Sequence, residues 1–432
     1  MKFTAAGDAL CQRRLPEGYD GFDAIRAFLS RGDARFFNFE STVHYEGECY
    51  GCQHSGGTYV RCDPEVLEDM LQFNFNCTTF NNNHAMDFAH EGLVRTLEYM
   101  NATGIVHAGV GLHLDQAAAP AYLETPKGRV ALIAVCTSFA PPMMAGVQSR
   151  RFRGRPGING ITVKQILHLP KADFEAACRI GDLTGINNEK KITRAEGYFP
   201  QLPAGTCEIG EQLCTESEEY GVSAVPNESD VARIRRSIRE AKLQADYVMV
   251  SIHAHQILSM EKSDTPDFLQ ALCRDFVDSG ADAVIGHGPH LLRAIEIYQR
   301  KPIFYSLGDF VLQLYQIPIA PEDFYAKYGI DSSAPVIELL EKRSAGFTRG
   351  LMEDPRMMET VIPYWETDEN NDLIRLELLP VQLSKGEGKH LEGLPRPAKD
   401  TAFMERLSAI SKPYGTTMEQ DGDLWVCHWE KE

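Results

Sequence analysis

Two histidines in a glycine-rich loop are the most informative residues of this chain. The loop reads Gly286-His287-Gly288-Pro289-His290 and directly follows the apolar segment 283–285. A short β-branched segment between glycines is typical of a buried parallel strand, and open α/β sheets bind ligands at the carboxyl ends of such strands. Neutral imidazole is the commonest metal-binding side chain. The loop therefore predicts a metal site, with locally satisfied loop histidines as the structural alternative.

Side chains of the same kind follow other predicted strands, far apart in the sequence. A single Asp or Asn after a strand is usually only a helix N-cap, but its repetition favours a shared site. Carboxylate, amide and imidazole donors together suit Mn, Fe or Zn and need no thiolate. The residues at these strand ends are Asp8, Glu40, the Asn81-Asn82-Asn83-His84 segment, His253, His255 and Asp309.

The order of these motifs resembles that of the CapA family of poly-γ-glutamate capsule-biosynthesis proteins, part of the metallophosphoesterase (calcineurin-like) superfamily. The resemblance spans about residues 1–384, with an unmatched stretch in the middle. It implies an α/β fold, a calcineurin-like sandwich of two packed sheets flanked by helices, with insertions. The matching motifs are Gly7-Asp8, Asn38-Phe39-Glu40, Asn82-Asn83-His84-Ala85-Met86-Asp87, Gly286-His287-Gly288-Pro289-His290 and Tyr305-Ser306-Leu307-Gly308-Asp309-Phe310.

The resemblance also implies a site with two divalent metal ions (Mn, Fe or Zn) and a general acid. His84 lies next to a ligand and would protonate the leaving group or donate to the transition state. Asp87 would orient His84, with a helix N-cap as the equally open alternative. The implied metal ligands are Glu40 as the bridge, Asp8 and His290 on the first ion, and Asn83, His253 and His287 on the second.

Three positions depart from the family pattern. The family's usual Gly-Asn-Phe is Gly308-Asp309-Phe310 here, and its His-Trp-Gly followed by Glu is His253-Ala254-His255-Gln256. The sequence therefore leaves open whether His253 or His255 is the ligand. After Asp87 the family prefers Gly, whereas this chain has Ala89-His90. These differences weaken the inference of which substrate binds more than they weaken the inference of a metal site.

An arginine-rich loop is the candidate substrate-binding segment. It contains four arginines between Ser149 and Ile161, with Gly154 and Pro156 defining turns. Guanidinium groups bind phosphate or carboxylate in a bidentate manner. We therefore predict that Arg155, and next to it Arg153, contacts an anionic substrate; a solvated charged loop is the alternative.

Composition limits the class of partner. The 432 residues carry a formal net charge of -18, which argues against nucleic acid or an anionic membrane as the main partner. An anionic substrate stays compatible, because metal ions and arginines reverse the local field. No apolar segment approaches the length of a membrane-spanning helix. A strand predicted from Lys2 leaves no room for a signal peptide, so we expect a cytoplasmic protein.

Cysteine usage argues against a disulfide framework, because eleven scattered cysteines is an odd number. Cys49, Cys52, His54 and Cys62 have the spacing of half a structural zinc site. The second half is missing, so free thiols are the favoured interpretation.

The predicted organisation is one CapA-like domain with two interruptions and a tail. The domain covers residues 1–384, with insertions at about 140–225 and 317–362. Residues 385–432 form a polar tail that we expect to pack on the domain through its aromatic residues. We expect a lid or irregular insertion in the first interruption because the strand–helix alternation stops there.

Two functions are compatible with these features. The first is a metal-dependent hydrolase that acts on a phosphoester or another anionic substrate, such as a small γ-glutamyl compound or a γ-glutamyl polymer. The second is a non-catalytic accessory protein of capsule assembly that binds a polyanion. The set of ligand types at the strand ends favours the hydrolase.

Overall fold

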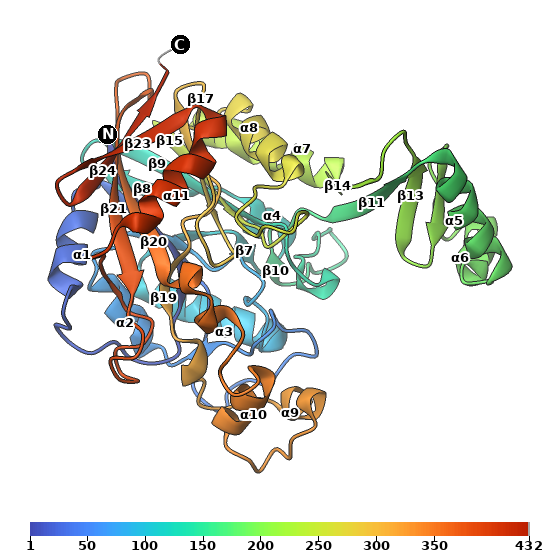
Figure 1. The fold of residues 1–432 in the computed structure, drawn as a ribbon, viewed down its shortest axis with the longest axis horizontal. Coiled ribbons are helices and arrows are strands. Elements are labelled where there is room, and N and C mark those ends of the chain that lie inside the picture. The colour runs from blue at the N-terminus through green and yellow to red at the C-terminus, as the bar shows by residue number, and fades with distance from the viewer. Residues whose placement is uncertain (431–432) are drawn as a thin grey trace. The chain divides into compact units, whose positions relative to one another are not determined.

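The structure is a computed structural model that describes residues 1–430. Within that range it is a mixed α/β protein with a main sheet of ten strands and a second sheet of six (Figure 1). In sheet order the main sheet contains β23 (Thr416–Asp421), β24 (Leu424–Trp429), β21 (Leu373–Leu383), β20 (Glu359–Thr367), β1 (Lys2–Leu10), β2 (Ala34–Phe39), β5 (Cys77–Thr79) and β6 (Val106–Ala108), with β19 (Asp309–Leu312) beside β1 and β22 (Pro395–Pro397) beside β21.

The second sheet consists mostly of parallel strands. Its neighbours β9, β15, β16 and β18 all run in the same direction, so their carboxyl ends meet at one edge. In sheet order it contains β17 (Ile295–Tyr298), β18 (Lys301–Phe304), β16 (Ala283–His287), β15 (Tyr247–His253), β9 (Gly128–Cys136) and β8 (Ala121–Thr125).

A buried core joins the two sheets. On the main sheet it includes Phe3 of β1 and Phe36 of β2. On the second sheet it includes Leu132 of β9 and Met249 of β15. Alternate strand residues point to opposite faces, so Phe37 of β2 instead joins the core on the other face of the main sheet. The predicted sandwich of two packed sheets is confirmed.

Helices cover the outer face of the main sheet. Apolar residues of three helices, α1 (Phe22–Leu29), α2 (Glu65–Leu71) and α3 (Ala89–Thr103), belong to the core on that face. On the second sheet, α4 (Leu114–Ala118) contacts β9 and α8 (Asp267–Asp278) contacts β16, while α7 (Glu228–Lys242) leads into β15. Two short pairs, β3 (Thr42–Val43) with β4 (Arg61–Cys62) and β7 (Val110–Gly111) with β10 (Gly157–Ile158), complete the connections.

Residues 161–231 form a separate compact unit, which overlaps much of the range 140–225 where a lid or partly irregular insertion was expected and extends beyond its end. Its strands are β11 (Val163–Leu169), β12 (Thr206–Ile209), β13 (Gln212–Glu216) and β14 (Gly221–Pro226), and its helices are α5 (Lys171–Leu183) and α6 (Asn188–Ala195). Several of its apolar side chains are exposed, among them Leu183 at 80% and Tyr198 at 76%. Residues 140–160 belong to the larger unit.

The second predicted insertion contains α9 (Glu322–Tyr328), α10 (Val336–Arg343) and two short 3-10 turns (Leu351–Glu353 and Pro355–Met358). β20 begins at Glu359, before the predicted end of that insertion, and pairs with β1 at the centre of the main sheet. In the tail, α11 (Ala402–Ser411) and β24 contribute Phe403 and Trp425 to the core between the sheets. The exact domain and insertion boundaries stay a proposal. Within residues 1–430, no helix is both long and apolar enough to cross a membrane.

Candidate metal centre

Oxygen and nitrogen donors of the candidate site come from different sheets. The predicted residues gather where strands of the two sheets end. The oxygen donors of the main sheet are Asp8 in β1, Glu40 after β2, Asn83 after β5 and Asp309 at the start of β19. The nitrogen donors of the second sheet are His253 at the end of β15, His287 at the end of β16, and His255 and His290 in the loops that follow these strands.

A close approach between two backbones places Asp8. β1 pairs in parallel with β2 and β19, so that Asp8 lies opposite Asn38 and Asp309. A Cβ atom on Gly7 would lie 1.8 Å from the carbonyl oxygen of Gly308, so that only glycine fits there. The amide of Asp8 donates to the same carbonyl at 3.0 Å. The Gly7-Asp8 motif is therefore a requirement of backbone packing as well as of chemistry.

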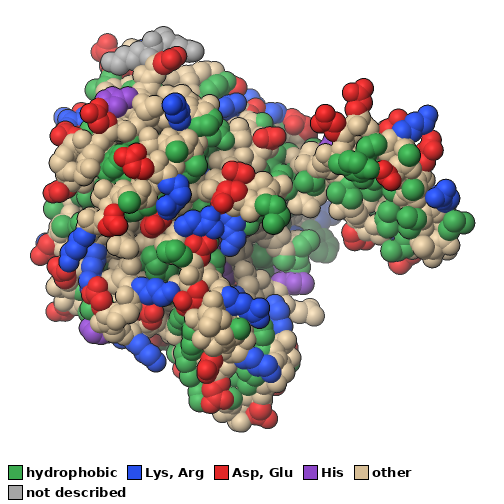
Figure 2. Space-filling view, viewed as in Figure 1, with side chains coloured by type: hydrophobic (Ala, Val, Ile, Leu, Met, Phe, Trp, Pro, Cys, Tyr) green, Lys and Arg blue, Asp and Glu red, His purple; other side chains and the backbone are tan. Residues whose placement is uncertain are grey.

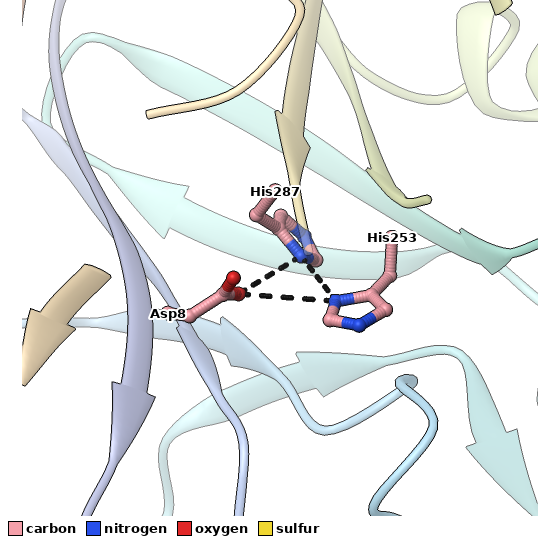
Figure 3. A group of neighbouring side chains, drawn as sticks. All are labelled: Asp8, His253 and His287. Atoms are coloured by element: carbon pink, nitrogen blue, oxygen red, sulfur yellow. Dashed lines mark hydrogen bonds and ion pairs between the residues drawn. The ribbon is translucent and has the colours of Figure 1, made fainter. Parts of the chain in front are cut away.

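Asp8 faces two histidines of the second sheet (Figure 3). Its Oδ1 lies 3.2 Å from Nδ1 of His287 and 3.8 Å from Nδ1 of His253, and these two nitrogens are 2.8 Å apart. Asn38 Nδ2 donates to Asp8 Oδ1 at 2.6 Å, and the amide of Gly288 donates to Oδ2 at 2.8 Å. Burial alone would raise the pKa of Asp8, but His287 and the Asn38 hydrogen bond outweigh it and leave the pKa below its ordinary value.

Glu40 faces both histidines of the His253-Ala254-His255 segment. Its Oε1 lies 3.5 Å from Nε2 of His253 and 3.9 Å from Nε2 of His255. Asn83 Oδ1 lies 2.6 Å and 3.0 Å from the same two nitrogens. The two imidazoles thus face the same oxygen donors, and His255 joins the candidate ligands beside His253.

A third group combines carboxylates with His290. One donor atom each from Asp8, Glu40, His290 and Asp309 lies within 4.8 Å of the others. His290 Nδ1 is 2.9 Å from Asp309 Oδ1. Burial raises the pKa of Asp309 to about 6, although His290 counteracts the rise. Asp309, at the position where the family usually has Asn, therefore supplies a further possible carboxylate ligand.

The polar atoms of this centre are short of protein partners. Both carboxylate oxygens of Glu40 and Oδ2 of Asp309 are buried and accept no hydrogen bond. Burial raises the pKa of Glu40 well above its ordinary range, and the negative charge of Asp8 is the second largest cause of this rise. Burial and the neighbouring imidazoles lower the pKa of His253, which favours the neutral form that binds metals. Because unpaired buried polar atoms are rare and costly, these residues fit a cation between them.

His84 and Asp87 lie beside this centre as a hydrogen-bonded pair. His84 Nδ1 lies 2.6 Å from Asp87 Oδ2, and His84 Nε2 lies 4.0 Å from Glu40 Oε1. The other interactions of Asp87 are with backbone amides, because Gly56 and Val60 each donate to it at 2.8 Å. The N-cap of α3 is Phe88, without a side-chain cap. The Asp87 side chain therefore contacts His84 and the amides of Gly56 and Val60, and it does not cap α3.

The loop of residues 52–60, called here the 52–60 loop, lies directly against these side chains. A Cβ atom on Gly56 would lie 2.6 Å from both Nδ2 of Asn83 and Cε1 of His84. Asn83 Nδ2 also donates to the Gly56 carbonyl at 3.2 Å. Sequence reasoning noted Cys52 and His54 of this loop only as part of a possible zinc site. It missed the contact with His84, because that contact spans about thirty residues.

The arginine loop lies outside these donor groups. The Arg155 guanidinium is exposed and donates to the carbonyl oxygen of Met144, at 3.2 Å from Nε and 3.0 Å from Nη2. Arg153 is exposed. All eleven cysteines are free, and among residues 1–430 the groups able to hold an ion contain no cysteine.

Comparison with known proteins shows the family of this chain. Residues 2–314 match the family model described as bacterial capsule synthesis protein PGA_cap. The chain belongs to the PGA_cap family. The predicted resemblance to CapA proteins is therefore confirmed, and with it the metallophosphoesterase-like superfamily.

Relatives of the PGA_cap family match different lengths of the chain. The uncharacterized protein y4sH of Sinorhizobium fredii is 33% identical over 427 residues, which cover 96% of this chain and 90% of that protein. The capsule biosynthesis protein CapA of Bacillus anthracis is 40% identical over 317 residues, 72% of this chain and 59% of that protein. A Mycobacterium tuberculosis protein described as a probable polyglutamine synthesis accessory protein is 22% identical over 289 residues, 65% of this chain and 55% of that protein.

Proposed function

We propose that this protein is a metal-dependent hydrolase of the CapA type, acting on a phosphoester or another anionic substrate such as a γ-glutamyl compound. The observation that carries the proposal is Glu40. It is fully buried among other donors, and neither of its oxygens accepts a hydrogen bond. Divalent ions bound there would polarise the substrate and lower the pKa of a bound water.

Two of the three groups of candidate ligands share Glu40, and the third consists of Asp8, His253 and His287. Asp8, His290 and Asp309 accompany Glu40 in one set, and His253 and His255 in the other. Asn83 contacts both histidines of the second set. His287 lies against Asp8 and His253, and its Nε2 is 2.6 Å from Ser251 Oγ. We keep the six predicted ligands and add His255 and Asp309 to them.

His84 is proposed as the proton donor. Its Nδ1 is bonded to Asp87, so this nitrogen carries the proton in the neutral ring if the carboxylate is ionised. Its Nε2 is directed toward Glu40 and the donor groups. Protonated at Nε2, the ring can donate to the leaving group or stabilise charge in the transition state. Asp87 stabilises the imidazolium during this step.

The substrate class follows from the family and from charge. Two relatives are named for capsule or polyglutamine synthesis, which favours a γ-glutamyl compound or polymer. Arg155, with Arg153 beside it, stays the proposed contact for its anionic groups. Arg155 is exposed and its guanidinium has one backbone partner, so several of its donors are available.

Metal analysis followed by a substrate screen tests the proposal. Protein purified without chelator is expected to contain Mn, Fe or Zn, and chelation should remove turnover of phosphoesters or γ-glutamyl peptides. Readdition of one of these ions should restore it. A protein that binds none of the three ions would contradict the proposal.

The accessory-protein alternative is favoured by the description of the mycobacterial relative. It predicts binding of a polyanion that is equal in wild type and His84→Asn, with no turnover by either. Metal-dependent turnover that falls in His84→Asn would exclude it.

A further inference from the structure

A small cavity in the second insertion contains two arginines. It has a volume of about 280 Å³ and lies between the 3-10 turn of residues Leu314–Gln316, the end of α10 and residues 344–351. Arg343 and Arg349 line it together with Tyr315 and leucine side chains, and the described residues that line it include no carboxylate. Figure 2 shows Lys and Arg side chains on the visible surface next to α10.

Neither arginine has a negatively charged partner within residues 1–430. Arg343 is half-buried, donates to the hydroxyl of Thr58 and lies over the ring of Phe324 at 5.6 Å. The Arg349 guanidinium is exposed and forms no hydrogen bond or ion pair with the described residues. A half-buried guanidinium such as that of Arg343 is unfavourable without a counter-ion, and the exposed guanidinium of Arg349 lines the same cavity. In a chain with a formal net charge of -18, such a pair favours an anion.

A carboxylate beside the cavity has a cationic partner. Tyr315 donates to Oε1 of Glu353 at 3.3 Å, and Lys385 Nζ lies 2.8 Å from Oε2 of the same side chain. The Lys385 charge therefore offsets that of Glu353.

The cavity is connected to the candidate site through the 52–60 loop. Arg343 binds Thr58, and Gly56, two residues earlier, packs on His84. Two residues of extended chain span at most about 7 Å. The 52–60 loop therefore contacts Arg343 at Thr58 and His84 at Gly56.

We propose that this cavity is a second anion-binding site, for a phosphate or carboxylate group on a short apolar stem. Arg343 and Arg349 bind the oxyanion, and Leu314, Leu340 and Leu351 contact the stem. The volume is below the usual range of roughly 300–1,000 Å³ for ligand pockets, so it fits one charged group and a short chain. The proposal does not depend on bound metal.

Binding to chelator-treated, metal-free protein tests this site separately from the metal centre. Isothermal titration with methylphosphonate, butylphosphonate and pentanoate should give one site, with butylphosphonate tighter than methylphosphonate. The comparison of butylphosphonate with pentanoate identifies the preferred headgroup. Arg349→Gln should weaken binding about tenfold or more, since it removes charge-assisted hydrogen bonds, whereas Arg349→Lys should retain part of it.

Arg179→Gln, at an exposed arginine of α5 that does not line the cavity, is the matched control and should bind as tightly as wild type. Arg343→Gln also loses the Thr58 contact, so Arg349→Gln decides the test if that variant misfolds. The proposal is overturned if metal-free wild type binds none of the three probes, or if Arg349→Gln binds them as tightly as wild type. Neither result would affect the metal assignment.

Discussion

Glu40 in the candidate metal centre and Glu208 in the unit of residues 161–231 are both buried, yet their surroundings differ. Glu208 is bound by Arg194 through both of its oxygens, one at 2.9 Å from Nη2, and Lys190 lies 3.9 Å away. Its hydrogen bond with Arg194 lowers its pKa, whereas burial raises that of Glu40. The comparison teaches that a buried carboxylate with a cationic partner stabilises a fold, and one without such a partner is suited to bind an ion.

Replacing Glu40 should have the largest effect. Glu40→Gln keeps the shape of the side chain but removes the charge shared by both donor sets. We expect loss of at least one ion and abolished turnover, because even residues outside the ligand shell change metal affinity by about 10- to 100-fold. Mass spectrometry of the native protein measures the metal content, and Glu208→Gln should keep it. Equal metal content in wild type and Glu40→Gln would contradict the bridging role.

In the metal-free protein, Glu40→Gln should affect the free energy of unfolding rather than metal content. Because the pKa of Glu40 is raised, the folded metal-free protein loses stability as the pH rises above the unfolded-state value of about 4.3. Glu40→Gln cannot ionise, so its free energy of unfolding at pH 7 should equal or exceed that of metal-free wild type. Chemical denaturation with chelator present measures this difference, and a strongly destabilised variant would mean that Glu40 has a protein partner.

Removing the proton donor should have the next largest effect. His84→Asn should retain its metals and lower turnover by about 10²–10⁴-fold. The loss should be greater for substrates with poor leaving groups, because a good leaving group needs little protonation. Loss of metal from His84→Asn would make His84 a ligand instead.

Replacing Gly56 in the 52–60 loop by alanine, which adds one methyl group, should have a smaller effect on turnover. The new side chain of Gly56→Ala would overlap Asn83 and His84, and displacement of catalytic groups by about 1 Å can cost about 10²-fold. We expect a fall in kcat of that order. Ser55→Ala is the control from the same loop and should stay close to wild type. An unchanged kcat for Gly56→Ala would show that the loop does not position His84.

The smallest effect is expected for Glu208. Glu208→Gln should lower the free energy of unfolding of its unit by about 1–2 kcal/mol, without changing metal content or turnover. Because the pKa of Glu208 is lowered, its stabilisation is present above about pH 4.3 and is lost as the pH falls through the lowered pKa. The difference in free energy of unfolding between wild type and variant, measured by urea denaturation, should therefore be smaller at pH 3 than at pH 7.

Some strand ends were predictable from the sequence, because an apolar segment precedes the candidate ligand. His287 ends β16 as predicted, whereas β1 continues past Asp8 to Leu10. The sandwich of two sheets was implied by the resemblance to the CapA family. Contacts between loops were not predictable. The bonds that hold Asp87 come from Gly56 and Val60, some thirty residues away, and no local pattern specifies them. β20 was assigned partly to an insertion because prolines precede it, although it lies beside β1.

The separation of donors between the sheets has a consequence for stability. Oxygen donors lie on the main sheet and nitrogen donors on the second, so an ion held by both sets acts as a cross-link between the two layers. Its binding free energy then adds to the free energy that keeps the sheets together, by an amount that grows with the concentration of free ion. A cell with little available metal would thus contain a protein that is less active and also easier to unfold.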